Sequence, residues 1–368
     1  MINTIKLAHG SGGREMGELI KFIRGCIPFT GDWECTDEDS AVLKSANLRG
    51  CEPACLACAS RAGRRESTQK NIPLTPHPSD RSVELASSKE RGFIAFTTDT
   101  FVVDPIFFAG GNIGDLAFNG TLNDLLVQGA EPLGISLALV LEEGFLFTDL
   151  GKILKSISKL SGKVKVPIAT GDTKVVPKGA IDKIMITTSG IGIVKNILSD
   201  KNLKPGDKII ASGTLGDHGA ALLANRFKYK TNLKSDTKPL LNEIKSVKDY
   251  LTSAKDPTRG GIAAVLNEMA KKSKIKIILD EEKIPIKKET MAIAKLLGIN
   301  KHALASEGRF VAGVSQKHVK KVINELKKFN KNAIIMGEVV DGEGVYIKNK
   351  LGEKRLDIPE GILIPRIC

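Results

Sequence analysis

The sequence lacks the features that mark several common classes of protein. No run of about 18 apolar residues is present that would span a bilayer. The first residues lack the charged and apolar regions of a secretory signal. Six cysteines are too few for a disulfide framework in a chain of 368 residues. We therefore expect a cytoplasmic protein that has no membrane partner and relies on its hydrophobic core.

A P-loop for nucleotide phosphates is also missing, because the pattern G-x-x-x-x-G-K-[ST] does not occur. Any nucleotide site must therefore neutralise phosphate charge by another device. The formal net charge is +13. The lysines are scattered along the chain, which is more typical of a solvated basic surface than of a nucleic-acid site. We therefore expect no nucleic-acid partner.

The length and the apolar content favour two domains. At 368 residues and 42% hydrophobic residues, the chain can form two cores of ordinary size. A turn at Lys204, Pro205 and Gly206 precedes a new strand and places the boundary near residue 200. We therefore divide the chain into an N-terminal domain (1–200), a C-terminal domain (201–347) and a mobile tail (348–368).

The periodicity of apolar residues alternates between strand and helix, which favours an α/β or α+β fold. Strands are expected at 93–99, 133–141, 182–194, 207–212, 275–280, 309–314 and 333–340. Helices are expected at 13–24, 112–128, 147–161, 216–226, 237–252, 258–272, 287–297 and 316–328.

Residues 49–92 differ in composition from the rest of the chain. This window holds six of the thirteen arginines but only two of the forty-two lysines, with many serines and prolines. It has too few apolar residues to offset the entropy of ordering, so we predict a mostly disordered insertion. Cys51, Cys55 and Cys58 within it have a spacing that can hold zinc or an iron–sulfur cluster, with Cys35 or His77 as a fourth ligand. Because the window is predicted to be disordered, we favour cysteines that bind no metal.

Four acidic residues occur at the ends of apolar strands or in glycine-bearing loops. They are Asp39, Asp99, Asp124 and Asp172. Each alone is also typical of a turn or a helix cap. As a set they indicate a cleft where hard oxygen ligands hold Mg²⁺ with the phosphates of a nucleotide.

Two glycine-bearing segments precede expected helices. In residues 256–261, Asp256 and Arg259 stand beside Gly260 and Gly261, so backbone N–H groups and a guanidinium can face a phosphate. The second segment runs from His9 to Gly13. An ordinary helix start with an aspartate cap explains the first segment equally well, and a lone glycine motif is weak support.

The chain ends on a cysteine, Cys368. A terminal thiol adds nothing to a core, so a reactive or carrier role competes with that of a stray cysteine. The twelve residues from Asp357 to Cys368 could span roughly 40 Å when extended. That length suffices to enter a cleft and to reach a partner.

Seven segments carry a resemblance to a known family. They are LAHGSGG at 7–13, TTDTFVVDP at 97–105, NDL at 123–125, GDTKVV at 171–176, DPTRGG at 256–261, ASEG at 305–308 and the terminal PRIC. Taken in order, these segments resemble the HypE family of hydrogenase maturation proteins, which belongs to the superfamily of aminoimidazole ribonucleotide synthetase and selenophosphate synthetase. The resemblance implies a PurM-like α/β architecture, in which an α+β N-terminal domain dimerises through its sheet and ATP binds between it and an α/β C-terminal domain.

The resemblance also implies a reaction and its partners. A carbamoyltransferase of the HypF family loads a carbamoyl group on the terminal cysteine, and ATP then dehydrates the S-carboxamide to an S-thiocyanate. The product supplies cyanide to the HypC–HypD complex for the iron of [NiFe]-hydrogenase.

By motif position, the resemblance assigns roles to individual residues. Lys174 and Glu307 are the candidates for proton transfer, and which of them is the base stays open, as does a structural salt bridge between them. Cys368 is the catalytic carrier; Asp39, Asp99, Asp124 and Asp172 bind Mg²⁺ and nucleotide; His9, Gly12, Gly13, Asn123, Asp256 and Arg259 bind nucleotide.

Two other functions compete with this interpretation. One is a small-molecule kinase or synthetase of the same superfamily. Selenophosphate synthetase itself would need a reactive cysteine or selenocysteine where Ser11 stands. The other is a basic binding protein without catalysis, which would leave the acidic motifs and the tail unexplained.

Overall fold

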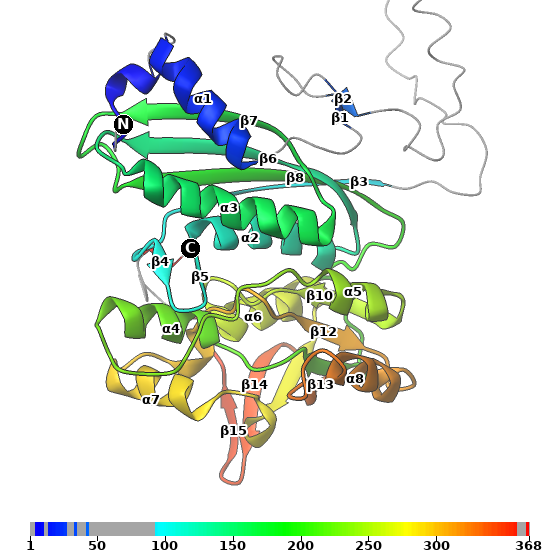
Figure 1. The fold of residues 1–368 in the computed structure, drawn as a ribbon. Coiled ribbons are helices and arrows are strands. Elements are labelled where there is room, and N and C mark those ends of the chain that lie inside the picture. The colour runs from blue at the N-terminus through cyan, green and yellow to red at the C-terminus, as the bar shows by residue number, and fades with distance from the viewer. Residues whose placement is uncertain are drawn as a thin grey trace, which may run out of the picture.

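The computed structural model describes residues 4–10, 14–27, 33–34, 42–43, 93–358 and 366–367. Figure 1 shows a four-stranded sheet with helices beneath it, stacked on a second domain that contains a seven-stranded sheet. The predicted two-domain α/β class is confirmed. The predicted insertion at 49–92, with its cysteines, lies outside the described residues.

The N-terminal domain is built around one mixed sheet. Its strands follow the order β3 (Phe93–Phe101), β8 (Ile184–Val194), β6 (Glu131–Glu142) and β7 (Ile168–Val176), and only the β6–β7 pair is parallel. The remaining elements are η1 (Leu7–Gly10), α1 (Arg14–Cys26), β1 (Trp33–Glu34), β2 (Val42–Leu43), β4 (Phe107–Phe108), β5 (Gly111–Asn112), α2 (Ile113–Val127) and α3 (Phe147–Val164).

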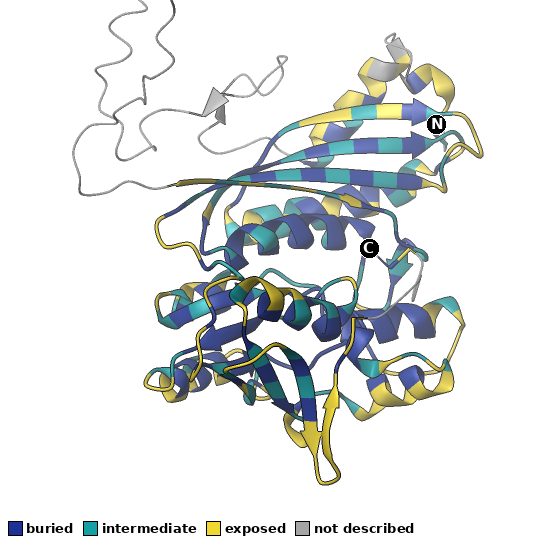
Figure 2. Ribbon diagram, turned by 180° about the vertical axis from the view of Figure 1, so that it is seen from behind, coloured by how far each residue is buried: buried dark blue, intermediate teal, exposed yellow. Residues whose placement is uncertain are grey.

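The two faces of this sheet differ. Alternate side chains of a strand point to opposite faces, and on β3 residues 95, 97 and 99 are half-buried on the side of α2. The side chains between them stay accessible, with Ile94 74% and Phe96 70% exposed. Figure 2 shows this exposure along β3 and β7. The sheet therefore carries large apolar side chains on a face that is open to solvent.

Helix α2 lies between the sheet and the C-terminal domain. Nearly all its residues are buried, which is expected for a helix that is covered on all sides. It begins with a capping box: the Asn112 side chain accepts hydrogen bonds from the N–H groups of Gly114 and Asp115, and the Asp115 carboxylate accepts one from the Asn112 N–H at 2.9 Å. This cap fixes the start of the helix that carries Asn123 and Asp124.

The C-terminal domain forms a seven-stranded mixed sheet with helices packed against it. Its strand order is β10 (Leu251–Lys255), β12 (Val311–Val314), β9 (Lys208–Ala211), β13 (Ile334–Val340), β11 (Lys276–Asp280), β14 (Gly344–Asn349) and β15 (Gly352–Arg355). The helices are α4 (Asp217–Arg226), α5 (Leu241–Val247), η4 (Lys248–Tyr250), α6 (Gly261–Ser273), η5 (Glu281–Lys283), α7 (Lys288–Leu296), η6 (Lys301–Ala303) and α8 (Val319–Lys327).

The two domains share one apolar core. Ile106 and Phe118 of the N-terminal domain belong to the same buried cluster as Leu240, Ile244 and Phe310 of the C-terminal domain. Burial of apolar surface stabilises such an interface without directional bonds. The relative position of the domains, and of any site between them, is thereby fixed.

Three local predictions need correction. The predicted helix at 237–252 is shorter, because α5 and η4 end at Tyr250 and strand β10 follows. The segment around Gly171 and Asp172, interpreted as a loop, is strand β7 and pairs with β6. The β14–β15 hairpin extends the C-terminal sheet to Arg355, beyond the predicted end of the domain at 347.

Candidate active site

Four carboxylates from both domains form a cluster at the domain interface. Asp99 comes from β3 and Asp124 from α2 of the N-terminal domain, whereas Asp256 follows β10 and Glu307 precedes β12 of the C-terminal domain. Asp99, Asp124 and Asp256 all raise the pKa of Glu307, and Asp99 also raises the pKa values of Asp124 and Asp256. We refer to these four residues as the acidic cluster.

Asp124 lies at the centre of this electrostatic group. Its carboxylate accepts a hydrogen bond from the Thr97 hydroxyl at 2.9 Å. Burial, followed by the negative charges of Asp256 and Asp99, raises the pKa of Asp124 to about 8. Burial and the charge of Asp99 raise the pKa of Asp256 to about 6. The cluster therefore binds protons near neutral pH unless a cation neutralises it.

Glu307 is the most deeply buried carboxylate of the acidic cluster. Its side chain is 2% exposed, and its Oε1 atom has no hydrogen-bond partner. Burial first, and then the charges of Asp256, Asp236, Asp124 and Asp99, raise the pKa of Glu307 well above its ordinary value. A carboxylate tuned in this way suits proton transfer.

Asp236, which the sequence analysis did not identify, holds the backbone of Glu307 in place. Asp236 Oδ1 accepts a hydrogen bond from the N–H of Glu307 at 3.0 Å, and Oδ2 lies 3.9 Å from Nε of Arg309. The residue after Glu307, Gly308, must be a glycine, because a Cβ there would lie 1.9 Å from the carbonyl oxygen of Asp236. The signal available in the sequence was the glycine after Glu307, which indicates a close backbone approach.

Asn123 connects the two domains. Its amide nitrogen donates to the carbonyl oxygens of Lys238 at 3.1 Å and Glu307 at 3.3 Å, and its side-chain oxygen accepts from the N–H of Leu240 at 2.9 Å. Asn123 is buried, and both ends of its side-chain amide are hydrogen-bonded to backbone groups. Asn123 therefore positions Glu307, and its predicted nucleotide contact stays a prediction.

The segment at 256–261 forms a tight turn into α6. Gly260 and Gly261 both have positive φ, and a Cβ on Gly261 would lie 2.5 Å from the carbonyl oxygen of His302. Gly260 caps α6 without a side-chain hydrogen bond, and Arg259 is exposed beside it. This arrangement leaves the helix start and a cation next to Asp256, as an anion site requires.

Asp172 and Lys174 lie elsewhere in the chain. Across the sheet, Asp99 shares a row with Leu137 and Gly171, so Asp172 on β7 projects from the opposite face. The strands β3 and β7 are also opposite edges of the sheet, three strand spacings or about 14 Å apart. The prediction that Asp172 joins Asp99 and Asp124 is therefore wrong for a single chain. For the same reason Lys174 and Glu307 form no ion pair within one chain.

His9, at the start of the N-terminal glycine segment, lies near β7. Element η1 contacts β7. His9 is buried there, with Nδ1 accepting from the N–H of Lys6 at 2.9 Å and its ring packed edge-on against Phe147. The predicted site thus divides into two groups, the acidic cluster and the β7 edge. The predicted site residues Gly12, Gly13, Asp39 and Cys368 lie outside the described residues.

The acidic cluster fits Mg²⁺ carrying a nucleotide. In the part of the chain that the structure describes, no three histidine, cysteine, aspartate or glutamate residues form a preassembled metal site. Mg²⁺, however, commonly takes one or two carboxylates and completes its shell with water and substrate phosphates. Asp99, Asp124 and Asp256 offer the hard oxygen ligands, and their raised proton affinity indicates a place where positive charge is favourable.

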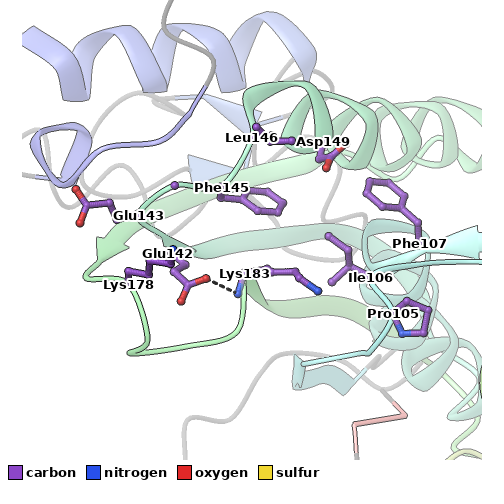
Figure 3. Close-up of a pocket in the computed structure, with 11 residues that line it drawn as sticks. Pro105, Ile106, Phe107, Glu142, Glu143, Phe145, Leu146, Asp149, Lys178 and Lys183 are labelled. Atoms are coloured by element: carbon purple, nitrogen blue, oxygen red, sulfur yellow. Dashed lines mark hydrogen bonds between the residues drawn. The ribbon is translucent and has the colours of Figure 1, made fainter. Parts of the chain in front are cut away.

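A pocket of about 460 Å³ lies at the ends of β6 and β8 (Figure 3). Glu142 on its rim accepts hydrogen bonds from the N–H groups of Gly179 at 2.7 Å and Lys183 at 3.1 Å. Glu142 lies five residues beyond Leu137, which shares the row of Asp99, and is thus about 17 Å along the strand. Its carboxylate organises a turn, and we assign the pocket no part in the chemistry.

No helix in the described ranges is long and apolar enough to cross a membrane.

Comparison with known proteins gives an independent assignment. The family model for the AIR synthase related protein, N-terminal domain, matches residues 82–194, and that for the C-terminal domain matches 204–350. Carbamoyl dehydratase HypE of Escherichia coli is 35% identical, and the match covers 100% of both chains.

Solved structures resemble this chain to a similar extent. A hydrogenase maturation protein HypE in complex with ATP has a TM-score of 0.79 at 30% identity and covers 99% of this chain and 100% of its own. A HypE–HypF complex gives 0.70 at 41% identity, covering 72% of this chain and 90% of that one. These similarities include both domains that form the acidic cluster.

Proposed function

Because the chain belongs to the HypE family of hydrogenase maturation proteins, we propose that it dehydrates a carboxamide on its own Cys368 to a thiocyanate. In this reaction the S-carboxamide and ATP yield the thiocyanate, ADP and inorganic phosphate. The amide oxygen leaves on the phosphate, and the two N–H protons are lost. The thiocyanate supplies the cyanide ligands needed for [NiFe]-hydrogenase maturation.

The observation that supports this proposal most directly is the position of the chain end. The carbonyl of Ile367 is hydrogen-bonded to His218 at 3.0 Å, and His218 contacts Ser235 at 2.8 Å. The next residue, Asp236, binds the backbone of Glu307. Cys368 follows Ile367 directly in the sequence, so we propose that the carrier is attached to a residue that the protein holds through His218. Tethering raises the effective concentration of a reactant.

Each part of the acidic cluster has a task in this reaction. Asp99, Asp124 and Asp256 would hold Mg²⁺, which neutralises phosphate charge when bound with the nucleotide. Glu307 accepts a proton from the carboxamide nitrogen, since its raised pKa makes its carboxylate a stronger base than that of an exposed glutamate. The helix start at Gly260 and Gly261, with Arg259, faces a phosphate.

We also infer a homodimer that pairs through the accessible face of the N-terminal sheet. Ile94 and Phe96 are highly exposed apolar side chains on this face, and exposed apolar patches often mark protein interfaces. Asp172 and Lys174 project from the same face. We infer that a second copy brings its Asp172 and Lys174 around the edge strand β3, whose other face carries Asp99 of the acidic cluster.

The proposed partners follow from the chemistry of the carrier. A carbamoyltransferase of the HypF family loads the thiol, in line with the solved HypE–HypF complex. The HypC–HypD complex accepts the cyanide. A reducing cytoplasm would keep the Cys368 thiol free for both steps.

Mass spectrometry of the C-terminal peptide tests the proposal. After incubation with the carbamoyltransferase, carbamoyl phosphate and ATP, the peptide first gains a carbamoyl group and then loses the mass of one water. Cys368→Ala should bind ATP normally and yield no product. Cys26→Ala is the matched control, because this half-buried thiol lies on α1 away from the site. A carbamoylated peptide that never loses water would contradict the proposal.

A further inference from the structure

The last two described residues are packed into the protein, although the sequence predicts a mobile tail. Ile367 is only 6% exposed and belongs to the main apolar cluster. The carbonyl oxygen of Arg366 accepts hydrogen bonds from the N–H of Asp104 at 3.2 Å and from Nη2 of Arg226 at 2.9 Å. The Arg366 guanidinium pairs with Asp182, whose pKa it lowers through a hydrogen bond. Chain ends usually fray unless such contacts hold them.

We propose that His218, Arg226 and Asp182 form a tail seat that positions the end of the chain for the dehydration step. They are positioning residues, because they contact the tail backbone and Arg366 rather than the reacting atoms. This inference rests on the proposed function, and it adds residues that no predicted motif contains.

His218 can hold the tail in only one way. The carbonyl oxygen of Ile367 can only accept, so Nε2 of His218 must carry the proton of their 3.0 Å hydrogen bond. Nδ1 then has a lone pair and accepts from the Ser235 hydroxyl at 2.8 Å. Burial lowers the pKa of His218 and keeps the ring neutral. The Ser235 oxygen in turn accepts from the N–H of Thr237 at 3.1 Å, which fixes its orientation.

Arg226 joins the tail to both domains. It stands at the end of α4 in the C-terminal domain, and its Nε and Nη2 atoms donate to the carbonyl oxygen of Asp104 at 2.9 and 2.7 Å. The same Nη2 donates to the tail at Arg366. A planar guanidinium can make these bonds together, whereas an ammonium group has no such fixed fork.

Asp182 holds the tail through the side chain of Arg366. It lies in the turn before β8 of the N-terminal domain and is about half exposed. The tail seat therefore combines one ion pair at the surface, one exposed hydrogen bond from Arg226 and one buried hydrogen bond from His218. Because surface ion pairs contribute little to stability, Asp182 offers a variant that changes the seat without endangering the fold.

Ser235 and Asp236 link the tail seat to the acidic cluster. Ser235 contacts His218, and its neighbour Asp236 accepts the N–H of Glu307. We therefore expect release of the tail from His218 to disturb Ser235 and Asp236, and through them Glu307, while Asp99, Asp124 and Asp256 keep their positions. Small misplacements of a tethered reactant are expected to slow the chemistry strongly.

The test compares Arg226→Ala, His218→Ala, His218→Gln and Asp182→Asn with the controls Arg355→Ala and His318→Ala. Arg355 is an exposed arginine on β15 that pairs with Asp357, and His318 lies before α8 against Tyr250, so neither belongs to the tail seat around Arg366 and Ile367. Two quantities are measured on the full chain: the alkylation rate of Cys368 by iodoacetamide, read from the C-terminal peptide, and the single-turnover dehydration rate of carbamoylated protein. The affinity for ATP is measured alongside.

We expect Arg226→Ala and His218→Ala to raise the alkylation rate about 10-fold and to lower the single-turnover rate at least 10-fold, with ATP affinity unchanged within about 3-fold. His218→Gln should recover part of both, because its amide can donate where Nε2 does. Asp182→Asn should give a smaller change in the same direction. Controls should match the parent protein.

Unchanged alkylation and dehydration rates in the folded Arg226→Ala and Asp182→Asn variants would overturn the tail seat. A parallel loss of ATP affinity would also overturn it, since that result indicates general damage to the fold. Failure of the proposed function looks different: alkylation would respond to the variants, while even the parent protein would yield no thiocyanate.

Discussion

At the scale of single residues, Asp124 shows a conflict between folding and function. Burial and the neighbouring carboxylates raise its pKa from 3.8 to about 8. An acid whose pKa is raised in the folded state adds stability below its unfolded pKa, and that stability is lost as the pH rises toward 8. The metal-free protein should therefore become less stable between about pH 4 and pH 8. Because these carboxylates lower the stability of the metal-free protein, we expect them to be present for binding a ligand.

Asp124→Asn removes the charge and keeps the acceptor for Thr97. We expect the variant to raise the unfolding free energy of the metal-free protein at pH 8 by about 1–3 kcal/mol and to weaken binding of Mg-ATP. Thermal unfolding at pH 5 and pH 8, with and without Mg-ATP, measures both effects. Asp357→Asn, at an exposed site outside the cluster, is the control. Equal stabilities of parent and variant at both pH values would contradict the account.

Asp236 acts on Glu307 by charge as well as by hydrogen bonding. Asp236→Asn keeps an oxygen for the Glu307 N–H and removes a negative charge that raises the pKa of Glu307. The pKa of Glu307 should fall, so its basic form should persist to lower pH. We expect the acid limb of the pH–rate profile for single-turnover dehydration to move down by about 1 pH unit. Glu307→Gln, which cannot accept the proton, should be inactive at every pH. An unmoved limb in Asp236→Asn would exclude this tuning.

Residues of the site were predictable where a motif carries its own chemistry. Asp99, Asp124, Asp256 and Glu307 stand in such motifs, and the structure brings them together. Asp236 was not predictable, because its role depends on burial behind Glu307 rather than on its neighbours in sequence. Such second-layer residues appear only when distant segments are placed side by side.

At the scale of elements, the turn between Glu307 and β12 depends on a glycine. A Cβ on Gly308 would overlap the carbonyl oxygen of Asp236, so Gly308→Ala should shift the backbone that carries Glu307. We expect a loss of about 1–3 kcal/mol in unfolding free energy together with a large loss of activity. Gly162→Ala in α3 is the matched control, because nothing lies within 4 Å of a Cβ there. It should stabilise the helix by about 0.5–1 kcal/mol. Equal stability of the two variants in urea unfolding would refute this role of Gly308.

Elements with strong apolar periodicity were predictable, and polar strands were not. Helices α3, α6 and α7 lie within a few residues of their predicted positions. Strand β7 was interpreted as a loop because Gly171, Asp172 and Lys174 interrupt its apolar pattern. Its pairing with β6 supplies the hydrogen bonds that its composition did not reveal. The propensity of a strand for its edge position depends on its neighbours in the sheet.

At the scale of the whole molecule, the chain separates two parts of one predicted site. The acidic cluster lies at the domain interface, whereas Asp172 and Lys174 lie at the far edge of the N-terminal sheet and on its other face. Sequence order alone cannot distinguish residues that meet within a chain from residues that meet between copies. A symmetric dimer presents the same surface twice, so each copy can complete the site of the other.

Mixed dimers of Lys174→Ala and Glu307→Gln chains distinguish these arrangements. If the site combines Glu307 of one copy with Lys174 of the other, each mixed dimer has one intact site and one site with both changes. Neither variant alone should show activity above about 1% of the parent, whereas mixing and re-equilibration should restore about one-quarter of it, since half of the dimers are mixed and each has one of two sites intact. If the two residues act within one chain, every site in a mixed dimer keeps one change and mixing restores nothing. Mixing Lys174→Ala with Asp172→Asn is the control, because both residues come from the same β7 strand and no intact site can form. Thiocyanate formation in the first mixture but not in the second would require an active site shared between two copies.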